Sequence, residues 1–236
     1  MSTKKTKRMS EILKGYDKLT YYSVPEAIDQ VLKNASAKFN ETIELHIYLG
    51  IDPRKSDQNV RGTVVLPNGT GKEVKVIAFV KADREKEALE AGAVEAGAEE
   101  LVNKVKGGWT GFDVCVATPD MMGMLGKGLG RVLGPKMPNP KAGTVTKEIG
   151  KTVKELKLGK VQYRGDKQGT LHSSIGKRDF GAAKLAENLA VLLDAVIKAK
   201  PATAKGTYLR SVTLTSTMGP SVRIDPLKIP AFLQGK

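Results

Sequence analysis

The sequence predicts a mixed α/β (α+β) protein built on buried strands. From Glu73 to Lys157, short apolar runs alternate with segments of helical periodicity, which is typical of a mainly parallel sheet covered by helices. Strand patterns with a period of two predominate toward both ends of the chain. A length of 236 residues suits one large domain or two small ones.

The best-marked helix lies near the N-terminus. Ser23–Glu26 forms a capping box, in which a hydroxyl and an acid three residues later satisfy the first amide groups of a helix, and Pro25 suits its first turn. Apolar residues follow at helical spacing: Ile28, Val31, Leu32 and Ala35. We therefore expect an amphipathic helix with one buried face.

A half-buried strand follows this helix. Alternate residues of Glu41–Ile51 are apolar, namely Ile43, Leu45, Ile47 and Leu49. The residues between them are polar or amphipathic: Glu44, His46 and Tyr48. A strand of this composition buries one face and exposes the other to solvent or to a partner.

The remaining elements are predicted from the same two periodicities. Strand patterns cover Thr63–Leu66, Glu73–Val80, Asp113–Ala117, Lys160–Tyr163, Thr170–Ile175, Tyr208–Thr215 and Ser221–Ile224. Helical patterns cover Ser10–Lys18, Arg84–Ala91, Glu99–Lys106, a segment starting at Pro119, Thr146–Lys157 and Asp179–Lys198. We expect Lys147, Lys151 and Lys154 to form a solvated helix face.

The segment Gly126–Val145 has an unusual composition. It contains five glycines, three prolines, four cations and no acid. Because glycine and proline disrupt helices and strands, we expect an irregular loop that stays outside the core. Its backbone amides and cations would face an anion.

The charge of the chain points to an anionic partner. The formal net charge is +14, and residues 125–160 carry nine bases and two acids. A phosphate backbone is the expected partner, since every cation that reaches a phosphate releases a counterion. An anionic membrane surface is the competing interpretation, and the absence of an apolar helix with a cationic face disfavours it. The basic tail Met1–Arg8 has no apolar run behind it and does not resemble a secretory signal.

Several kinds of catalytic site are disfavoured by spacing. Gly69–Lys72 lacks the earlier glycine and the following Ser or Thr of a phosphate-binding P-loop. One cysteine, Cys115, and two distant histidines do not make a zinc site, and Cys115 is expected to be an inert buried residue. Three functions remain: an RNA-binding protein, an enzyme that acts on a phosphorylated substrate through Gly126–Val145, and a nucleic-acid chaperone without a fixed site.

Small polar residues gather at predicted strand ends and turns. Ser211, Thr213 and Thr215 alternate along one strand, which ends in Thr217–Pro220. Hydroxyls and free amides suit folded RNA, which proteins recognise by shape and by its 2′-hydroxyl groups. The chain has only twelve aromatic residues, which disfavours a stacking platform for single strands. Phe39 could contact a nucleotide or cap the core, and the sequence leaves both open.

Four segments resemble sequences of the ribosomal protein L1 family. Its members, here of the bacterial type, form the stalk of the large ribosomal subunit. The four segments are KFNETIELHIYLGIDPRKSDQNVRGTVVLPNGTG, TPDMMGMLGKGLGRVLGPKMPNPKAGTV, YRGDKQGTLHSSIGK and SVTLTSTMGPSVRID. The segments occur in the family's order, and the resemblance runs over nearly the whole chain.

The resemblance implies two domains. Residues 1–68 and 160–236 would form a discontinuous split α/β sandwich that binds rRNA. Residues 69–159 would form an inserted Rossmann-like three-layer α/β/α domain that binds no dinucleotide.

The resemblance also implies a function without catalysis, cofactor or metal. The protein would be a cytoplasmic, ribosomal constituent that binds large-subunit (23S) rRNA to form the mobile stalk near the tRNA exit site. It would assist the release of deacylated tRNA, repress translation by binding its own mRNA, and be a monomer when free of the ribosome.

Two sets of residues correspond to these contacts. The expected RNA-binding residues are Phe39, Thr42, Glu44, Arg164, Lys167, His172, Ser173, Ser211, Thr217, Met218 and Gly219. The residues expected to contact the tRNA are Arg54, Lys55, Lys127, Arg131 and Lys136.

Overall fold

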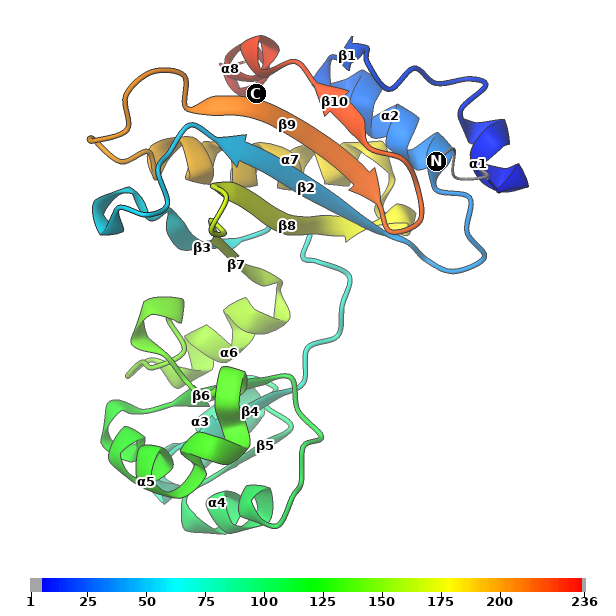
Figure 1. Ribbon diagram of the computed structural model, residues 1–236. Helices are drawn as coiled ribbons and strands as arrows, with labels where there is room; N and C mark the ends of the chain where they lie inside the picture. Colours follow the sequence, from blue (N-terminus) through cyan, green and yellow to red (C-terminus); the bar gives the residue numbers. More distant parts are fainter. Residues whose placement is uncertain (1–5, 235–236) are drawn as a thin grey trace. The chain divides into compact units, whose positions relative to one another are not determined.

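The computed structural model describes residues 6–234, without the side chains of Ser56 and Lys141. Part of the predicted basic tail, residues 1–5, lies outside the described residues. The chain forms two compact units: unit 1 is Met1–Gly71 with Val161–Lys236, and unit 2 is Lys72–Lys160 (Figure 1). Strands and helices occur in both units, which confirms the predicted mixed α/β class.

Unit 1 is built on a five-stranded sheet. Its strands, in spatial order, are β1 (Tyr21–Tyr22), β10 (Val222–Ile224), β9 (Leu209–Ser216), β2 (Thr42–Leu49) and β8 (Thr170–Lys177). β1 pairs with β10 in parallel, and all the other pairs are antiparallel. The long strands β2, β8 and β9 thus join two segments that are far apart in the sequence.

Further elements complete unit 1. The α-helices are α1 (Lys7–Ile12), α2 (Val24–Asn34), α7 (Gly181–Lys198) and α8 (Ile229–Gln234). β3 (Arg61–Val65) and β7 (Lys160–Arg164) pair in a sheet of their own. The predicted capping box of α2 is confirmed, since the Glu26 carboxylate accepts a hydrogen bond from the Ser23 amide at 3.0 Å.

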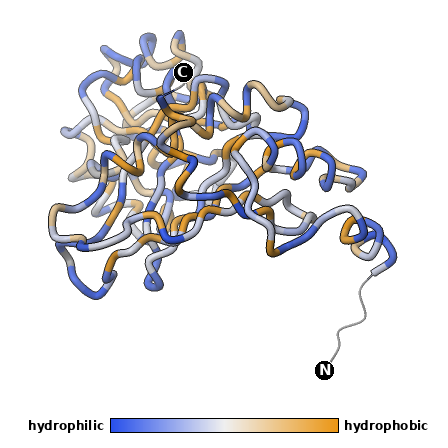
Figure 2. Tube along the Cα trace, turned by 90° about the horizontal axis from the view of Figure 1, so that it is seen from above, coloured by the Kyte–Doolittle hydropathy of each residue, from blue (hydrophilic) through white to orange (hydrophobic). Residues whose placement is uncertain are grey.

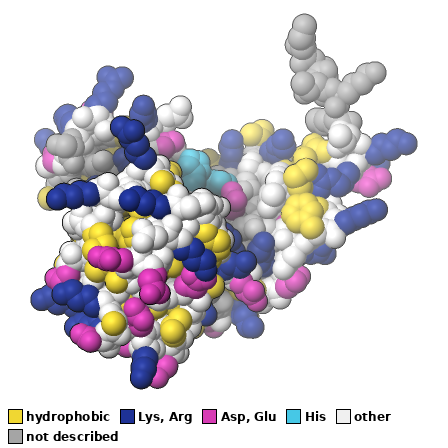
Figure 3. Space-filling model, turned by 90° about the horizontal axis from the view of Figure 1, so that it is seen from below, with side chains coloured by type: hydrophobic (Ala, Val, Ile, Leu, Met, Phe, Trp, Pro, Cys, Tyr) yellow, Lys and Arg dark blue, Asp and Glu magenta, His cyan; other side chains and the backbone are white. Residues whose placement is uncertain are grey.

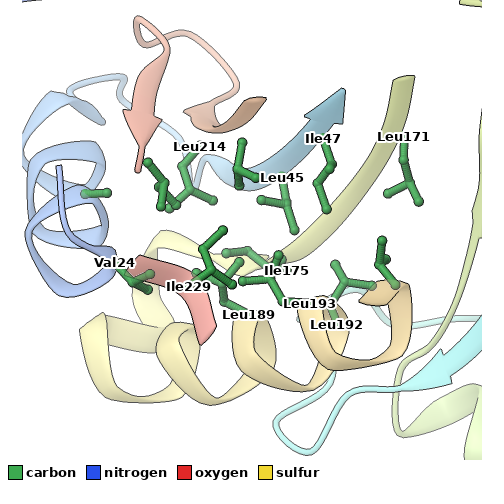
Figure 4. Packing of buried hydrophobic residues seen from close by; sticks show 14 of the residues in the cluster. Val24, Leu45, Ile47, Leu171, Ile175, Leu189, Leu192, Leu193, Leu214 and Ile229 are labelled. Atoms are coloured by element: carbon green, nitrogen blue, oxygen red, sulfur yellow. The ribbon is translucent and has the colours of Figure 1, made fainter. Parts of the chain in front are cut away.

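The core of unit 1 lies between one face of the five-stranded sheet and the helices α2 and α7. The predicted apolar face of β2 is fully buried, and Leu189, Leu192 and Leu193 of α7 point toward it (Figure 4). Hydrophobic and hydrophilic residues alternate along much of the chain trace (Figure 2). Because helices cover one face only, the outward-facing residues of the sheet remain accessible.

Unit 2 is a three-layer structure with a parallel sheet of β5 (Glu95–Gly97), β4 (Val76–Phe79) and β6 (Val114–Ala117), in that spatial order. Ile77 and Phe79 pack with α4 (Glu99–Lys106) and α5 (Met122–Leu133). Val76 and Ala78 pack on the opposite side with α3 (Glu85–Glu90) and α6 (Ile149–Lys157). Alternate residues of β4 thus bury both faces of the sheet, as expected for a parallel strand between helices.

The expectation that Gly126–Val145 is irregular and lies outside the core is wrong for its first part. Residues 126–133 belong to α5. Leu125, Leu129 and Leu133 recur every four residues, and all three are buried in the core of unit 2. Burial of this stripe outweighs the cost of about 1 kcal/mol that each interior glycine adds to a helix.

Candidate nucleic-acid interface

The uncovered side of the unit 1 sheet is lined with polar groups, and we call it the polar face. It consists of Glu44, His46, Tyr48, Thr170, His172, Ser174, Ser211, Thr213 and Thr215. The strand register sets these residues in rows: Ser174 and Thr215 flank Glu44, His172 and Thr213 flank His46, and Thr170 and Ser211 flank Tyr48. Hydroxyl groups thus lie on both sides of β2.

The only two histidines of the chain meet on the polar face. Their Nδ1 atoms are 2.7 Å apart, and Nε2 of His46 lies 2.9 Å from the Thr215 hydroxyl. Burial lowers the pKa of His46 from its usual value of 6.5, and the nearby His172 lowers it further, against the opposing effect of Glu44. The imidazoles reach the molecular surface (cyan in Figure 3). One of the facing Nδ1 atoms must lack a proton if the two share a hydrogen bond.

The loop Thr217–Gly219 is fastened to the start of β2. The Thr217 hydroxyl accepts a hydrogen bond from the Thr42 amide at 3.1 Å, and the Thr217 amide donates to the Thr42 carbonyl at the same distance. The Met218 amide donates to Oε2 of Glu41 at 2.9 Å. These contacts join residues predicted as sites from opposite ends of the chain.

Glu41 holds this corner of the sheet together and was missed by sequence reasoning. The residue is fully buried, and its second oxygen accepts a hydrogen bond from the Ala37 amide at 2.8 Å. Burial by itself would raise the pKa of Glu41, but the two amide donors and the positive charge of Arg8 outweigh it, so the pKa is lowered. The sequence shows that an acidic residue precedes the strand, but it does not show which backbone amides that residue binds.

The side chains at this corner protrude. Met218 is 49% exposed and Phe39 is 51% exposed. Phe39 is thus not a core residue, which removes one of its two interpretations. A Cβ atom on Gly219 would lie 2.3 Å from the Ser216 hydroxyl oxygen, so the turn has room only for glycine unless Ser216 moves.

Two predicted cations lie beside β8. Arg164 ends β7, and Lys167 sits in the turn that precedes β8; both are exposed. Oδ1 of Asp166 accepts hydrogen bonds from the Gln168 and Thr170 amides, both at 2.8 Å, which fixes the turn. His172 lies 3.8 Å from the Asp166 carboxylate. The turn thus places Lys167 directly after Asp166, whose carboxylate lies near the histidine pair.

Ser173 does not lie on the polar face. It is 7% exposed and shares the inward side of β8 with Leu171 and Ile175. Its neighbour Ser174 faces outward, opposite Glu44. The strict alternation of a strand explains why the two serines lie on opposite faces, and it also places His46 and Ser174 on the polar face, although the prediction did not name them.

The five residues expected to contact tRNA fall in two units. Arg54 and Lys55 follow β2 in unit 1, whereas Lys127 and Arg131 on α5 and Lys136 after it belong to unit 2. All five are exposed. The Lys136 ammonium also donates to the Phe112 carbonyl and lies 4.8 Å from the centre of the Phe112 ring.

The chemistry of Cys115 does not favour catalysis. It is buried in the core of unit 2, and burial raises the pKa of its thiol to about 12. The histidines belong to unit 1. In residues 6–234, no cluster of three or more His, Cys, Asp or Glu could hold a metal ion, and no helix is both long and apolar enough to span a bilayer.

A net charge of +14 and a hydroxyl-rich sheet face that no described helix covers are typical of proteins that bind nucleic acids through surface contacts. Residues 31–220 match the model of the ribosomal protein L1p/L10e family, so the chain belongs to this family. Membership makes it a ribosome-associated, non-enzymatic constituent of the large subunit that binds rRNA.

Proposed function

We propose that unit 1 is the rRNA-binding domain and that its polar face, with the loop Thr217–Gly219 and Phe39, contacts the RNA of the stalk region. The inserted unit 2 is then a separate domain. In this proposal the protein forms the stalk near the tRNA exit site, assists the release of deacylated tRNA, and represses translation of its own mRNA through the same face.

The observation that carries the proposal is the corner where Thr42, Glu41 and Met218 meet. Residues about 175 positions apart are hydrogen-bonded there, and the apolar side chains of Met218 and of Phe39, two positions before Glu41, protrude. A rigid corner of this kind needs no rearrangement before it meets a folded RNA, which lowers the entropic cost of binding.

The composition of the face suits RNA rather than DNA. Hydroxyls of Ser174, Thr213 and Thr215 can exchange hydrogen bonds with 2′-hydroxyl groups, which DNA lacks. Arg164 and Lys167 add charge for phosphates, and the Glu44 carboxylate can accept from sugar or base donors.

The proposed contact with tRNA rests on exposed positive charge, and the proposed repression of the messenger rests on the same polar face. Five exposed cations, Arg54, Lys55, Lys127, Arg131 and Lys136, remain the proposed tRNA contacts. Repression follows if the messenger presents a fold like that of the rRNA site, because one surface then serves both.

Met218→Ala tests the proposed face. Met218 is half exposed, so its truncation should leave the fold intact but remove apolar contact with RNA. We expect affinity for a stalk-region rRNA fragment to fall at least fivefold in a filter-binding assay at constant salt. Leu227→Ala, at a more exposed apolar residue outside the face, is the matched control. Equal affinity of both variants and the parent chain would contradict the proposal.

A further inference from the structure

The topology of unit 2 creates a crevice that is lined by none of the residues proposed to contact rRNA. β4 comes first in the chain and lies in the centre of the sheet, with β5 on one side and β6 on the other. The segment after β4 leads to α3 on one face of the sheet, and the segment after β6 leads to α5 on the opposite face. Open α/β sheets bind ligands at this point, outside the carboxyl ends of the strands where the connections diverge.

A cavity of about 400 Å³ lies at this point. Its lining comes from three segments: the one after β4, the one after β6, and Lys147, which lies two positions after the bridge between Val145 and Ala117. The lining residues are Lys81, Asp83, Arg84, Thr118, Pro119, Asp120 and Lys147. The volume is within the range of sites for small molecules.

Thr118 supplies a polar group without a partner. The residue is 6% exposed, and among the described residues its hydroxyl has no hydrogen-bond partner. Buried hydroxyls are nearly always paired, because leaving one unpaired costs roughly 1–3 kcal/mol. Thr118 lines the cavity, and rotation of its side chain toward the cavity would let a ligand oxygen pair with the hydroxyl.

The charges of the lining favour an anion. Lys81, Arg84 and Lys147 outnumber the acids Asp83 and Asp120. Nη1 of Arg84 donates to the Lys147 carbonyl at 2.6 Å, which holds the guanidinium beside the third segment of the lining. Lys81 pairs with Asp120 at 3.5 Å, but both side chains are about two-thirds exposed, so this ion pair can rearrange at little cost.

We propose that this cavity binds the phosphate group of a small phosphomonoester, with Thr118, Arg84 and Lys147 as its contacts. A concave site with a buried hydroxyl suits a terminal phosphate on a small molecule better than the diester backbone of a folded RNA. The segments after β4 and β6 lack a glycine-rich turn, so the site suits one phosphate rather than the pyrophosphate of a dinucleotide.

Amide chemical shifts of the full-length ¹⁵N-labelled protein test the site. The probes are inorganic phosphate and adenosine 5′-monophosphate, each added at an ionic strength held constant with sodium chloride. We expect saturable shifts at Arg84, Thr118, Asp120 and Lys147 with both probes. Tighter binding of the nucleotide would identify a nucleoside monophosphate as the ligand, and equal binding would identify phosphate itself.

Variants separate a built site from diffuse attraction. Thr118→Val and Arg84→Gln should each weaken phosphate binding at least fivefold. Thr118→Ser keeps the hydroxyl group and should bind phosphate as tightly as the parent chain. Lys86→Gln removes an exposed cation of α3 that does not line the cavity and should change nothing. If the spectrum of Thr118→Val shows that this variant does not fold, the affinities of Arg84→Gln and Thr118→Ser for phosphate still test the site.

The site is excluded if the shifts grow linearly with ion concentration, or if Lys86→Gln weakens binding as much as Arg84→Gln. Stronger shifts of the same amides with a short RNA that carries no terminal phosphate would also overturn it, since the cavity would then serve RNA. Binding of the stalk-region rRNA by Thr118→Val should equal that of the parent chain, so this inference and the proposed function can fail independently.

Discussion

The Glu41 carboxylate and the Met218 amide, 177 positions apart in sequence, share a hydrogen bond of 2.9 Å at one corner of the unit 1 sheet. The same carboxylate also accepts from the Ala37 amide, so one buried side chain orders two loops. The protruding Phe39 and Met218 belong to these loops or their flanks. The geometry of the proposed RNA-binding surface therefore depends on Glu41, a buried residue beneath it.

Replacement of Glu41 should destabilise unit 1. Glu41→Gln directs an amide group toward one of two backbone donors, and the loss of hydrogen bonds to a buried charge costs roughly 2–3 kcal/mol. Urea unfolding followed by far-UV circular dichroism measures the change. Glu44→Gln, on the exposed face, should change stability by less than about 0.5 kcal/mol. Equal stability of the two variants would show that Glu41 has no such role.

Glu41 should also make stability depend on acid pH. Its pKa in the folded protein lies below the usual value of 4.5, so the unfolded chain takes up this proton first. The stabilisation is present above pH 4.5 and is lost as the pH falls below it. The difference in stability between the parent chain and Glu41→Gln should therefore shrink toward low pH. A difference that does not vary with pH would exclude this linkage.

The histidine pair predicts a second pH effect. The pKa of His46 is lowered from 6.5, so the unfolded chain binds this proton first, and stability falls as the pH decreases below 6.5. His172→Gln removes a neighbouring charge and should raise the pKa of His46 toward 6.5, though not fully, because burial is the larger cause. Titration of the imidazole resonances by NMR measures the pKa of His46 in the parent chain and in the variant. A lower pKa in the variant would refute the coupling.

Lys167 should contribute to RNA affinity through charge alone. Lys167→Gln removes one phosphate contact, so the slope of log affinity against log salt should become shallower by roughly 0.7–0.9. The control Lys184→Gln alters an exposed cation of α7, on the helical side of the sheet, and should keep the parent slope. If both variants have the same slope, Lys167 does not contact the RNA.

The glycines of α5 predict a stabilising change. A Cβ atom at Gly126 or Gly130 meets nothing within 4 Å, so Gly126→Ala and Gly130→Ala should each stabilise unit 2 by about 0.5–1 kcal/mol. The fluorescence of Trp109, the only tryptophan, reports on unit 2 during unfolding. A loss of stability would mean that these glycines have a role in the fold that the helix does not reveal.

Gly50 predicts the opposite effect. Its added Cβ would lie 2.1 Å from the Thr207 carbonyl oxygen, a backbone atom that cannot turn away as a side chain does. Gly50→Ala should therefore destabilise unit 1 by roughly 1–3 kcal/mol. Thermal unfolding monitored by circular dichroism compares this variant with Gly126→Ala. A higher melting temperature for Gly50→Ala than for the parent chain would contradict the packing described above.

Periodicity predicted most of the fold because its elements bury a clear face. α4 matches its predicted bounds, and β2 has the predicted inward and outward residues. β5 was missed because its three residues, Glu95–Gly97, carry no strand pattern, and only pairing with β4 defines it. α8 was also not predicted, because its six residues are too few to show a clear helical period.

The candidate site was predictable in its parts but not in its assembly. Alternation along β8 separates Ser173 from Ser174, but the prediction named Ser173 from the family resemblance and did not use this alternation. The buried Glu41 and the meeting of His46 with His172 depend on strand register across distant segments, which one sequence does not encode locally.

The central claim, that the polar face of unit 1 binds RNA, is tested most directly by NMR titration of the ¹⁵N-labelled chain with a stalk-region rRNA fragment. We expect the largest changes at the amides of residues 39–48, 164–174 and 211–219. Changes confined to unit 2, or to the helical side of the unit 1 sheet, would contradict it.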